Sequence, residues 1–121
     1  GNHQPGPEAY MEITGKEFKH CHLVSVEGRV DSATAPEFGK KLDALIENGV
    51  YKIVIDMGKL EYMSSAGFRA LLAAQRQCKR YNRGEVLLAA VPDRIREALE
   101  LAGFTELFQL FPDPLDAVGS F

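Results

Sequence analysis

The chain has 121 residues, of which 45% are apolar, and its formal net charge is −3 at pH 7. This length predicts a single domain with a hydrophobic core. The acidic balance argues against a nucleic-acid partner, and no apolar run approaches the length of a membrane span.

Residues 1–9 are polar and rich in Gly and Pro, so we expect a flexible tail or a cloning remnant ahead of one domain at residues 10–121. A first strand is predicted at residues 10–18, with a turn near Gly15 and Lys16. A second strand is predicted at residues 20–27, with alternate residues on opposite faces of the sheet and Gly28 at its end.

The first helix is expected to begin at Thr34, which with Glu37 matches the capping-box pattern, and to end at Asn48 and Gly49. Its apolar stripe comprises Phe38, Leu42, Leu45 and Ile46.

The apolar and β-branched run at residues 50–57 predicts a central strand covered on both faces. A short loop then leads to a second helix at about residues 65–82, closed by Gly84. The inward line of that helix comprises Phe68, Leu71, Leu72, Gln75, Cys78 and Lys79.

A fourth strand is predicted at residues 85–91, followed by a third helix with Pro92 in its first turn and Gly103 after its end. Residues 105–111 predict an edge strand, and residues 112–121 at most a short helix. Because strands alternate with helices, we expect parallel crossovers. The predicted fold class is α/β, with one mixed, mainly parallel sheet of four to five strands and about four helices packed against it.

Ser64 and Ser65 stand where the third strand leads into the second long helix. Backbone N–H groups and the helix dipole favour negative charge at such a position. Taken alone, Ser64 is most simply a helix cap and Ser65 a residue of the first turn. The alternatives are a nucleophile and a phosphorylation switch.

Catalysis by Ser65 is disfavoured. The strand–serine–helix order is typical of a nucleophile elbow, but Met63 stands where that motif has its first glycine. His3, His20 and His22 all lie upstream, so the hydrolase order of serine, acid and histidine cannot be made. We expect no catalytic residue and no enzyme activity.

Metal and nucleotide sites are also disfavoured. His20 and His22 share one face of a strand while Cys21 points away, and two ligands are too few for a closed metal site. No glycine-rich phosphate-binding motif is present, so we expect no cofactor. Cys21 and Cys78 are interpreted as reduced, buried thiols of a cytoplasmic protein. The basic cluster Arg76, Lys79, Arg80 and Arg83 favours a solvated helix face, with docking of an acidic partner as the alternative.

Three segments carry a joint pattern: residues 28–35, Gly-Arg-Val-Asp-Ser-Ala-Thr-Ala, residues 53–68 and residues 91–104. Read together, they resemble STAS domains, the family of sulphate transporters and anti-sigma factor antagonists. The first segment is similar to the family's Gly-Glu-Leu-Asp-x-x-Thr-Ala turn, the second to its strand, loop and helix start, and the third to its last turn and helix. The resemblance covers residues 10–118 and implies a small α/β domain.

The resemblance also implies partner switching. The unmodified protein would bind an anti-sigma factor that is also a serine kinase of the histidine-kinase-like ATPase type, and this binding would free the sigma factor. Phosphorylation would end the binding, and a serine phosphatase would restore it. We expect a monomer or a weak homodimer. Within the family, a module that binds a small ligand or nucleotide, or a scaffold in a larger signalling complex, is the alternative.

Carried over residue by residue, Ser65 matches the family's phosphorylated serine, Gly67 its glycine and Phe68 its leucine. Asp31 matches the acidic residue that lies beside that serine and contacts the kinase. The family's aspartate before the serine is Ser64 here, which makes Ser64 a second candidate acceptor. The expected partner-binding residues are Asp31, Ser32, Thr34, Met63, Ser64, Ser65, Gly67, Phe68 and Arg69.

Overall fold

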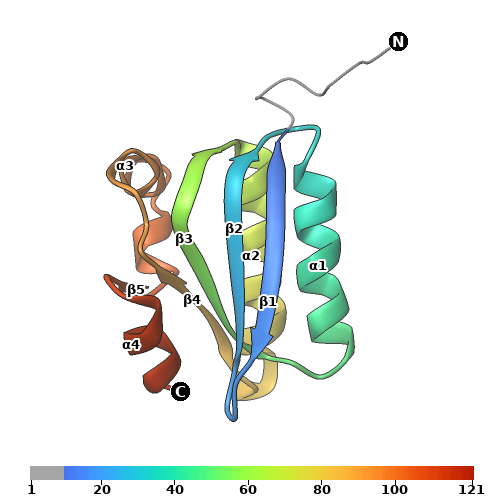
Figure 1. The fold of residues 1–121 in the computed structure, drawn as a ribbon. Helices are drawn as coiled ribbons and strands as arrows, with labels where there is room; N and C mark the ends of the chain where they lie inside the picture. The colour runs from blue at the N-terminus through green and yellow to red at the C-terminus, as the bar shows by residue number, and fades with distance from the viewer. Residues whose placement is uncertain (1–9) are drawn as a thin grey trace.

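Five strands form one sheet in the computed structural model, which describes residues 10–121 (Figure 1). The strands are β1 (Met11–Glu17), β2 (His22–Val30), β3 (Lys52–Met63), β4 (Glu85–Ala89) and β5 (Leu110–Phe111). The helices are α1 (Ala35–Glu47), α2 (Ser65–Lys79), α3 (Asp93–Leu101) and α4 (Pro114–Gly119), with short 3-10 helices η2 (Arg80–Asn82) and η3 (Phe104–Glu106). The predicted α/β class is confirmed, whereas the predicted tail at residues 1–9 lies outside the described residues.

The strands lie in the sheet in the same order as in the chain. β1 and β2 form an antiparallel hairpin, and β2, β3, β4 and β5 are parallel neighbours. Because β2 and β3 are parallel, their ends lie at the same end of the sheet, together with the starts of α1 and α2, at the top of Figure 1. We call this the carboxyl end of the sheet, and the opposite end, where β2 and β3 begin, the amino end.

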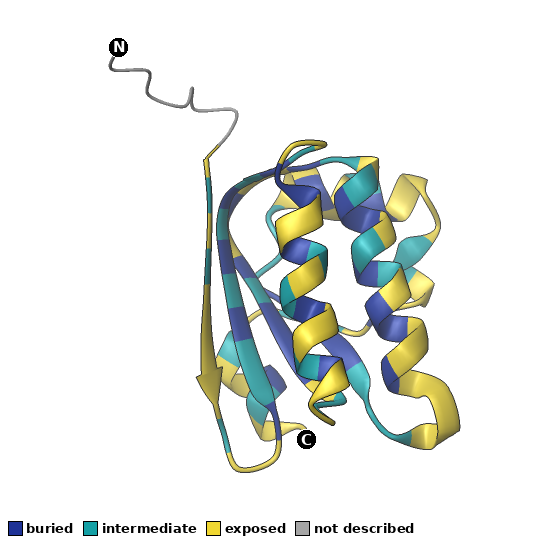
Figure 2. Cartoon of the chain, turned by 90° about the vertical axis from the view of Figure 1, so that its right-hand side faces the viewer, coloured by how far each residue is buried: buried dark blue, intermediate teal, exposed yellow. Residues whose placement is uncertain are grey.

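Each face of the sheet has its own core. α1 and α2 lie side by side on one face (Figure 2), where the buried stripe of α1, including Phe38 and Leu42, meets Ile53 and Ile55 of β3. A smaller cluster packs Ala117 of α4 against the other face. β3 is therefore covered on both faces, as its continuous apolar run predicts. Within the described residues, no helix is both long enough and apolar enough to cross a membrane.

Gln75 completes the edge of β4 from the side of α2. It is 3% exposed, and its carboxamide accepts a hydrogen bond from Val86 N (2.7 Å) while donating to Val86 O (3.2 Å) and Leu107 O (2.8 Å). β5 pairs only with Leu88 and Ala89. The side chain of Gln75 therefore takes the place of a longer β5 and satisfies backbone groups that would otherwise be unpaired.

The hairpin differs from its predicted form. β1 runs straight through Gly15 and Lys16, and the chain turns at residues 18–21, where Phe18 N donates to Cys21 O at 2.8 Å. β2 does not end at Gly28 but continues to Val30. Gly28 has a φ of +90°, which glycine adopts without strain, and it marks an irregularity in the pairing with β3 rather than a stop.

Several other boundaries also shift. β3 includes residues 58–63, which were predicted as a loop, because the extended β2 continues to pair with them. α2 ends at Lys79 and continues as η2. Pro92 is the N-cap of α3 rather than a residue of its first turn, and the predicted edge strand contains η3 before the two-residue β5. The predicted helix ends at Gly49 and Gly103 are confirmed, with φ values of +84° and +75°.

Candidate functional site

The first turn of α2 presents two serines in different roles. Ser64 is the N-cap: its backbone is extended, and its Oγ accepts a hydrogen bond from Gly67 N at 3.4 Å. Ser65 is the first residue of the helix and is exposed, and its hydroxyl makes no hydrogen bond within residues 10–121. The free hydroxyl of Ser65 thus lies beside the unpaired N–H groups of a helix of 15 residues.

The pairing of β2 with β3 brings a second loop to this helix start. Val30 pairs with Met63, and Ser64 N donates to Val30 O at 2.7 Å. Asp31 follows Val30 directly, so the turn from β2 into α1 lies against the start of α2 at the carboxyl end of the sheet (Figure 1).

Asp31 and Thr34 hold that turn in shape. Asp31 Oδ1 accepts hydrogen bonds from Ala33 N (2.9 Å) and Thr34 N (3.1 Å). The Thr34 hydroxyl accepts from Asp31 N (2.9 Å) and donates to Arg29 O (2.8 Å). This corrects the predicted capping box: Thr34 turns its hydroxyl back toward β2 and makes no side-chain cap bond to α1.

The same hydrogen bonds affect the charge of Asp31. Partial removal from water raises the pKa of its carboxyl. The N–H groups of Thr34 and Ala33, the Thr34 hydroxyl and the charge of Arg29 together lower that pKa by more than desolvation raises it. The net pKa lies below the ordinary aspartate value. Asp31 therefore carries a full negative charge beside the helix start at neutral pH.

This lowered pKa predicts a pH dependence of stability. A carboxyl whose pKa is lower in the folded chain contributes stability above its unfolded pKa and loses it as the pH falls through the folded value. On acidification from about pH 7 to about pH 3, across the ordinary aspartate range, the wild type should lose more unfolding free energy than Asp31→Asn. Urea unfolding at a series of pH values measures the difference.

Asp43→Asn is the matched control, because Asp43 is an exposed carboxylate of α1 that makes no side-chain hydrogen bond within residues 10–121. Its acid-induced loss should equal that of the wild type. Parallel curves for the wild type and Asp31→Asn would contradict the prediction.

Arg29 and Tyr62 flank the helix start, and the sequence does not predict a contact between them. The Arg29 guanidinium lies over the Tyr62 ring, 4.4 Å from its centroid, and the two residues pair across β2 and β3. Tyr62 is 39% exposed, and Arg29 Nε is buried without a hydrogen-bond partner within the described residues. The register of β2 against β3 shifts between Gly28 and Arg29, and this shift places Arg29 opposite Tyr62. No local sequence pattern indicates such a shift.

Burial divides the predicted partner-binding residues into two groups. Asp31 and Ser64 are half-buried, and Ser32, Ser65 and Arg69 are exposed. The others are at most 9% exposed, so their side chains form the support beneath the surface, and their predicted part in partner binding stays a prediction. This buried group is Thr34, Met63, Gly67 and Phe68.

The histidines and cysteines among residues 10–121 lie away from Ser65 or are unreactive. His20 and His22 lie at the amino end of the sheet, so neither can act as a base for Ser65 at the opposite end. Within the described part of the chain, no group of three acidic, histidine or cysteine side chains could hold a metal ion. Burial raises the pKa of the Cys21 thiol, and that of Cys78 to about 11, so both are protonated at neutral pH.

Comparison with known proteins defines the class. The STAS domain model matches residues 12–117, and the chain therefore belongs to the STAS family. BtrV of Bordetella bronchiseptica, a candidate anti-sigma factor antagonist, is 32% identical over 98 residues, which cover 81% of this chain and 84% of the relative. The anti-sigma-B factor antagonist of Staphylococcus aureus is 28% identical over 87 residues, covering 72% and 80%.

Solved structures agree on the fold. An anti-sigma factor antagonist from Mycobacterium paratuberculosis superimposes with a TM-score of 0.81 at 23% identity, covering 93% of this chain and 94% of that chain. The phosphorylated form of the Bacillus cell fate determinant SpoIIAA superimposes with a TM-score of 0.72 at 15% identity, covering 90% and 98%.

Proposed function

We propose that this protein is an anti-sigma factor antagonist whose binding is switched off by phosphorylation of Ser65. It would bind an anti-sigma factor through a docking surface formed by Asp31, Ser32, Ser64, Ser65 and Arg69. The observation that carries the proposal is the free, exposed hydroxyl of Ser65 at the start of α2, next to the charged Asp31 turn. The names of the two sequence relatives support the choice of partner.

The physical effect of the modification is local. A phosphoserine at neutral pH adds nearly two negative charges and three acceptor oxygens. At Ser65 these charges meet the amino end of α2, whose unpaired N–H groups and dipole favour an anion. The folded domain can therefore accept the phosphate without rearrangement.

The effect on a partner is the opposite. A partner that covers the docking surface would have to remove the phosphate from water beside the carboxylate of Asp31, with exposed Glu61 four residues before Ser65. Desolvation and like-charge repulsion both oppose this. A loss of about 3 kcal/mol in binding free energy corresponds to a weakening of more than a hundredfold.

The kinase in this scheme is the anti-sigma factor itself, of the histidine-kinase-like ATPase type, and a serine phosphatase restores the binding-competent form. The protein would then act in signal transduction and transcription regulation through protein contacts alone, with no catalytic residue of its own. A relative in fold that has a phosphorylated form is consistent with this cycle.

A binding experiment with two substitutions tests the switch. The histidine-kinase-like anti-sigma factors of the source organism are titrated with the wild type, Ser65→Ala and Ser65→Asp by calorimetry. The wild type and Ser65→Ala should bind alike, whereas Ser65→Asp should bind at least about tenfold more weakly, because one carboxylate supplies part of the phosphate charge. Ser120→Asp adds the same charge at an exposed position near the chain end and should bind like the wild type.

Intact-mass measurement after incubation with the kinase and ATP identifies the acceptor. The wild type should gain one phosphate and Ser65→Ala none. Uptake that persists in Ser65→Ala but disappears in Ser64→Ala would move the acceptor to Ser64. Equal affinities of Ser65→Asp and Ser65→Ala for every anti-sigma factor would overturn the switch.

A further inference from the structure

The amino end of the sheet, opposite Ser65, carries a cluster of positively charged side chains. Between residues 62 and 84 the sequence contains five Lys and Arg residues and no Asp or Glu, although the whole chain has a net charge of −3. Three of these cations, Lys79, Arg80 and Arg83, stand at the end of α2 and the start of the connection to β4. Within residues 10–121 none of them forms an ion pair, because the one ion pair found there joins Arg96 to Asp93.

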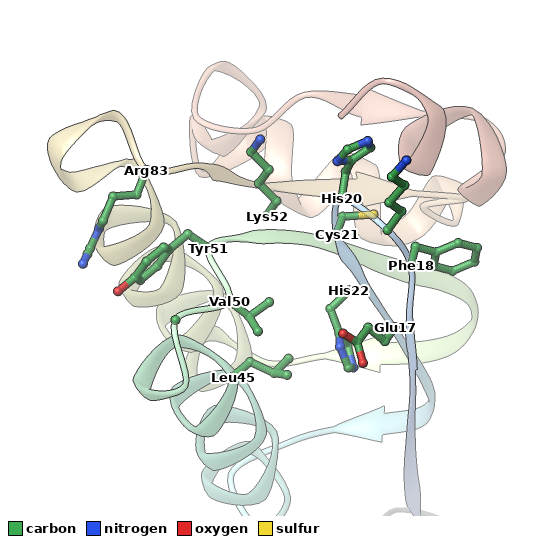
Figure 3. A pocket seen from close by; sticks show the side chains of 12 residues that line it. Glu17, Phe18, His20, Cys21, His22, Leu45, Val50, Tyr51, Lys52 and Arg83 are labelled. Carbon is green, nitrogen blue, oxygen red and sulfur yellow. The ribbon is translucent and has the colours of Figure 1, made fainter.

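A hollow of about 460 Å³ opens beside these cations, bounded by the β1–β2 turn, the α1–β3 connection and the connection after α2. Figure 3 shows Leu45, Val50 and His22 pointing toward one another within it. Burial, followed by the charge of Lys41, lowers the pKa of His22 against the opposing effect of Glu17, so the imidazole is neutral at neutral pH. The volume lies within the range of small binding pockets.

The rim of the hollow is cationic. Lys19, Lys52 and Arg83 line it against a single carboxylate, that of Glu17, and both lysines are exposed. The Arg83 guanidinium lies 3.9 Å from the centroid of the Tyr51 ring (Figure 3). Among residues 10–121 it donates only to the neutral carbonyl oxygens of Arg80 and Gln77, so no carboxylate there compensates its charge.

An exposed aromatic side chain adjoins this rim. Tyr81 is 80% exposed, and the guanidinium carbons of Arg80 and Arg83 lie 5.4 and 5.8 Å from its ring centroid. Tyr81 and Asn82 have φ values of +58° and +56°, a left-handed conformation that asparagine adopts readily but tyrosine rarely. Arginine and tyrosine are the residues enriched where proteins bind one another.

We propose that the amino end of the sheet is a second docking site, which binds an acidic protein segment with a large apolar side chain seated between Leu45 and Val50. The cations extend from Lys19 to Arg80, across three connections of the chain, which suits a peptide with several carboxylates better than one small anion. The apolar side chains of Leu45 and Val50 supply a place for the apolar anchor. The site is separate from Ser65 and does not rest on the phosphorylation switch.

A peptide titration tests this site on the full chain. The probe is a dye-labelled peptide of alternating glutamate and phenylalanine, followed by fluorescence anisotropy, with contacts mapped by amide chemical shifts. Two control peptides replace either all phenylalanines by glycine or all glutamates by lysine. The shifts should be largest at Val50, Tyr51 and His22, and both control peptides should bind at least about tenfold more weakly, since each lacks one half of the proposed recognition.

Charge reversal gives an independent readout. The double variant Lys52→Glu, Arg80→Glu should weaken peptide binding at least about tenfold, and added salt should weaken wild-type binding, because exposed charges are screened. Lys59→Glu reverses an exposed charge of β3 outside the hollow and should leave binding unchanged. Shifts centred elsewhere, equal binding of the double variant, or tighter binding of duplex DNA or anionic vesicles than of the peptide would each overturn the proposal.

Discussion

Gly67→Val is expected to lower the free energy of unfolding by about 3 kcal/mol, with a smaller loss of about 1–2 kcal/mol for Gly67→Ala. A Cβ at this position would lie 2.6 Å from Met63 Cγ and 2.8 Å from Val30 Cγ1. The Val30 side chain is stiff at χ1 and fully buried, so it cannot move aside. Alanine gains about 1 kcal/mol of helix propensity over glycine, which is not enough to offset the overpacking.

Urea unfolding measures both variants, and Gly39→Ala is the matched control. Gly39 lies within α1, where an added Cβ would meet only Ala70 Cβ at an ordinary contact of 3.8 Å. That variant should be more stable than the wild type by up to about 1 kcal/mol, because only the propensity term remains. If Gly67→Ala were stabilising to the same degree, close packing of α2 on β2 and β3 would not be the reason for a glycine beside Ser65.

Gln75→Ala is expected to cost about 3 kcal/mol of unfolding free energy, because it leaves the buried N–H and C=O groups of Val86 and the part-buried C=O of Leu107 without this side-chain partner. The lost contacts are those with Val86 and Leu107. The cavity left by the carboxamide adds to the loss. Hydrogen exchange should show the same effect as faster exchange at Val86 N–H, whose acceptor is the Gln75 carboxamide.

Gln77→Ala is the control for helix propensity, since Gln77 lies two residues further along α2 and is exposed. The same change of residue type there should be neutral or slightly stabilising. A loss of equal size in the two variants would show that the Gln75 hydrogen bonds contribute no net stability.

The helices were the most predictable part of the fold because their determinants are local. Phe38, Leu42 and Ile46 repeat at helical spacing and are buried together, and Gly49 ends α1 as predicted. The strands were less predictable where pairing partners decide their length. β3 extends to Met63 only because β2 continues past Gly28, and that continuation depends on irregularities that need both strands at once.

The candidate site shows the same division. The position of Ser65 at a helix start could be predicted, since a strand, two serines and an apolar stripe are consecutive in the chain. The burial of Phe68 follows from the predicted inward line of α2, but that of Met63 beside Val30 could not be predicted. Nor could the partner of Phe68, which is Phe104, because the two rings meet edge-on with centroids 6.1 Å apart and come from distant parts of the chain. The Arg29–Tyr62 pair and the Gln75 bonds likewise join residues far apart in sequence, which no local spacing reveals.

The exposed start of α2 has a consequence for how long a signal would last. A dianion added at Ser65 would meet amide groups that already point toward it, so the domain need not melt or refold when it is charged or discharged. The rates of the kinase and the phosphatase would then determine the lifetime of each state. The same molecule could pass through many cycles without unfolding. How long either state persists would depend on the balance of those enzyme activities rather than on a slow conformational change of the polypeptide.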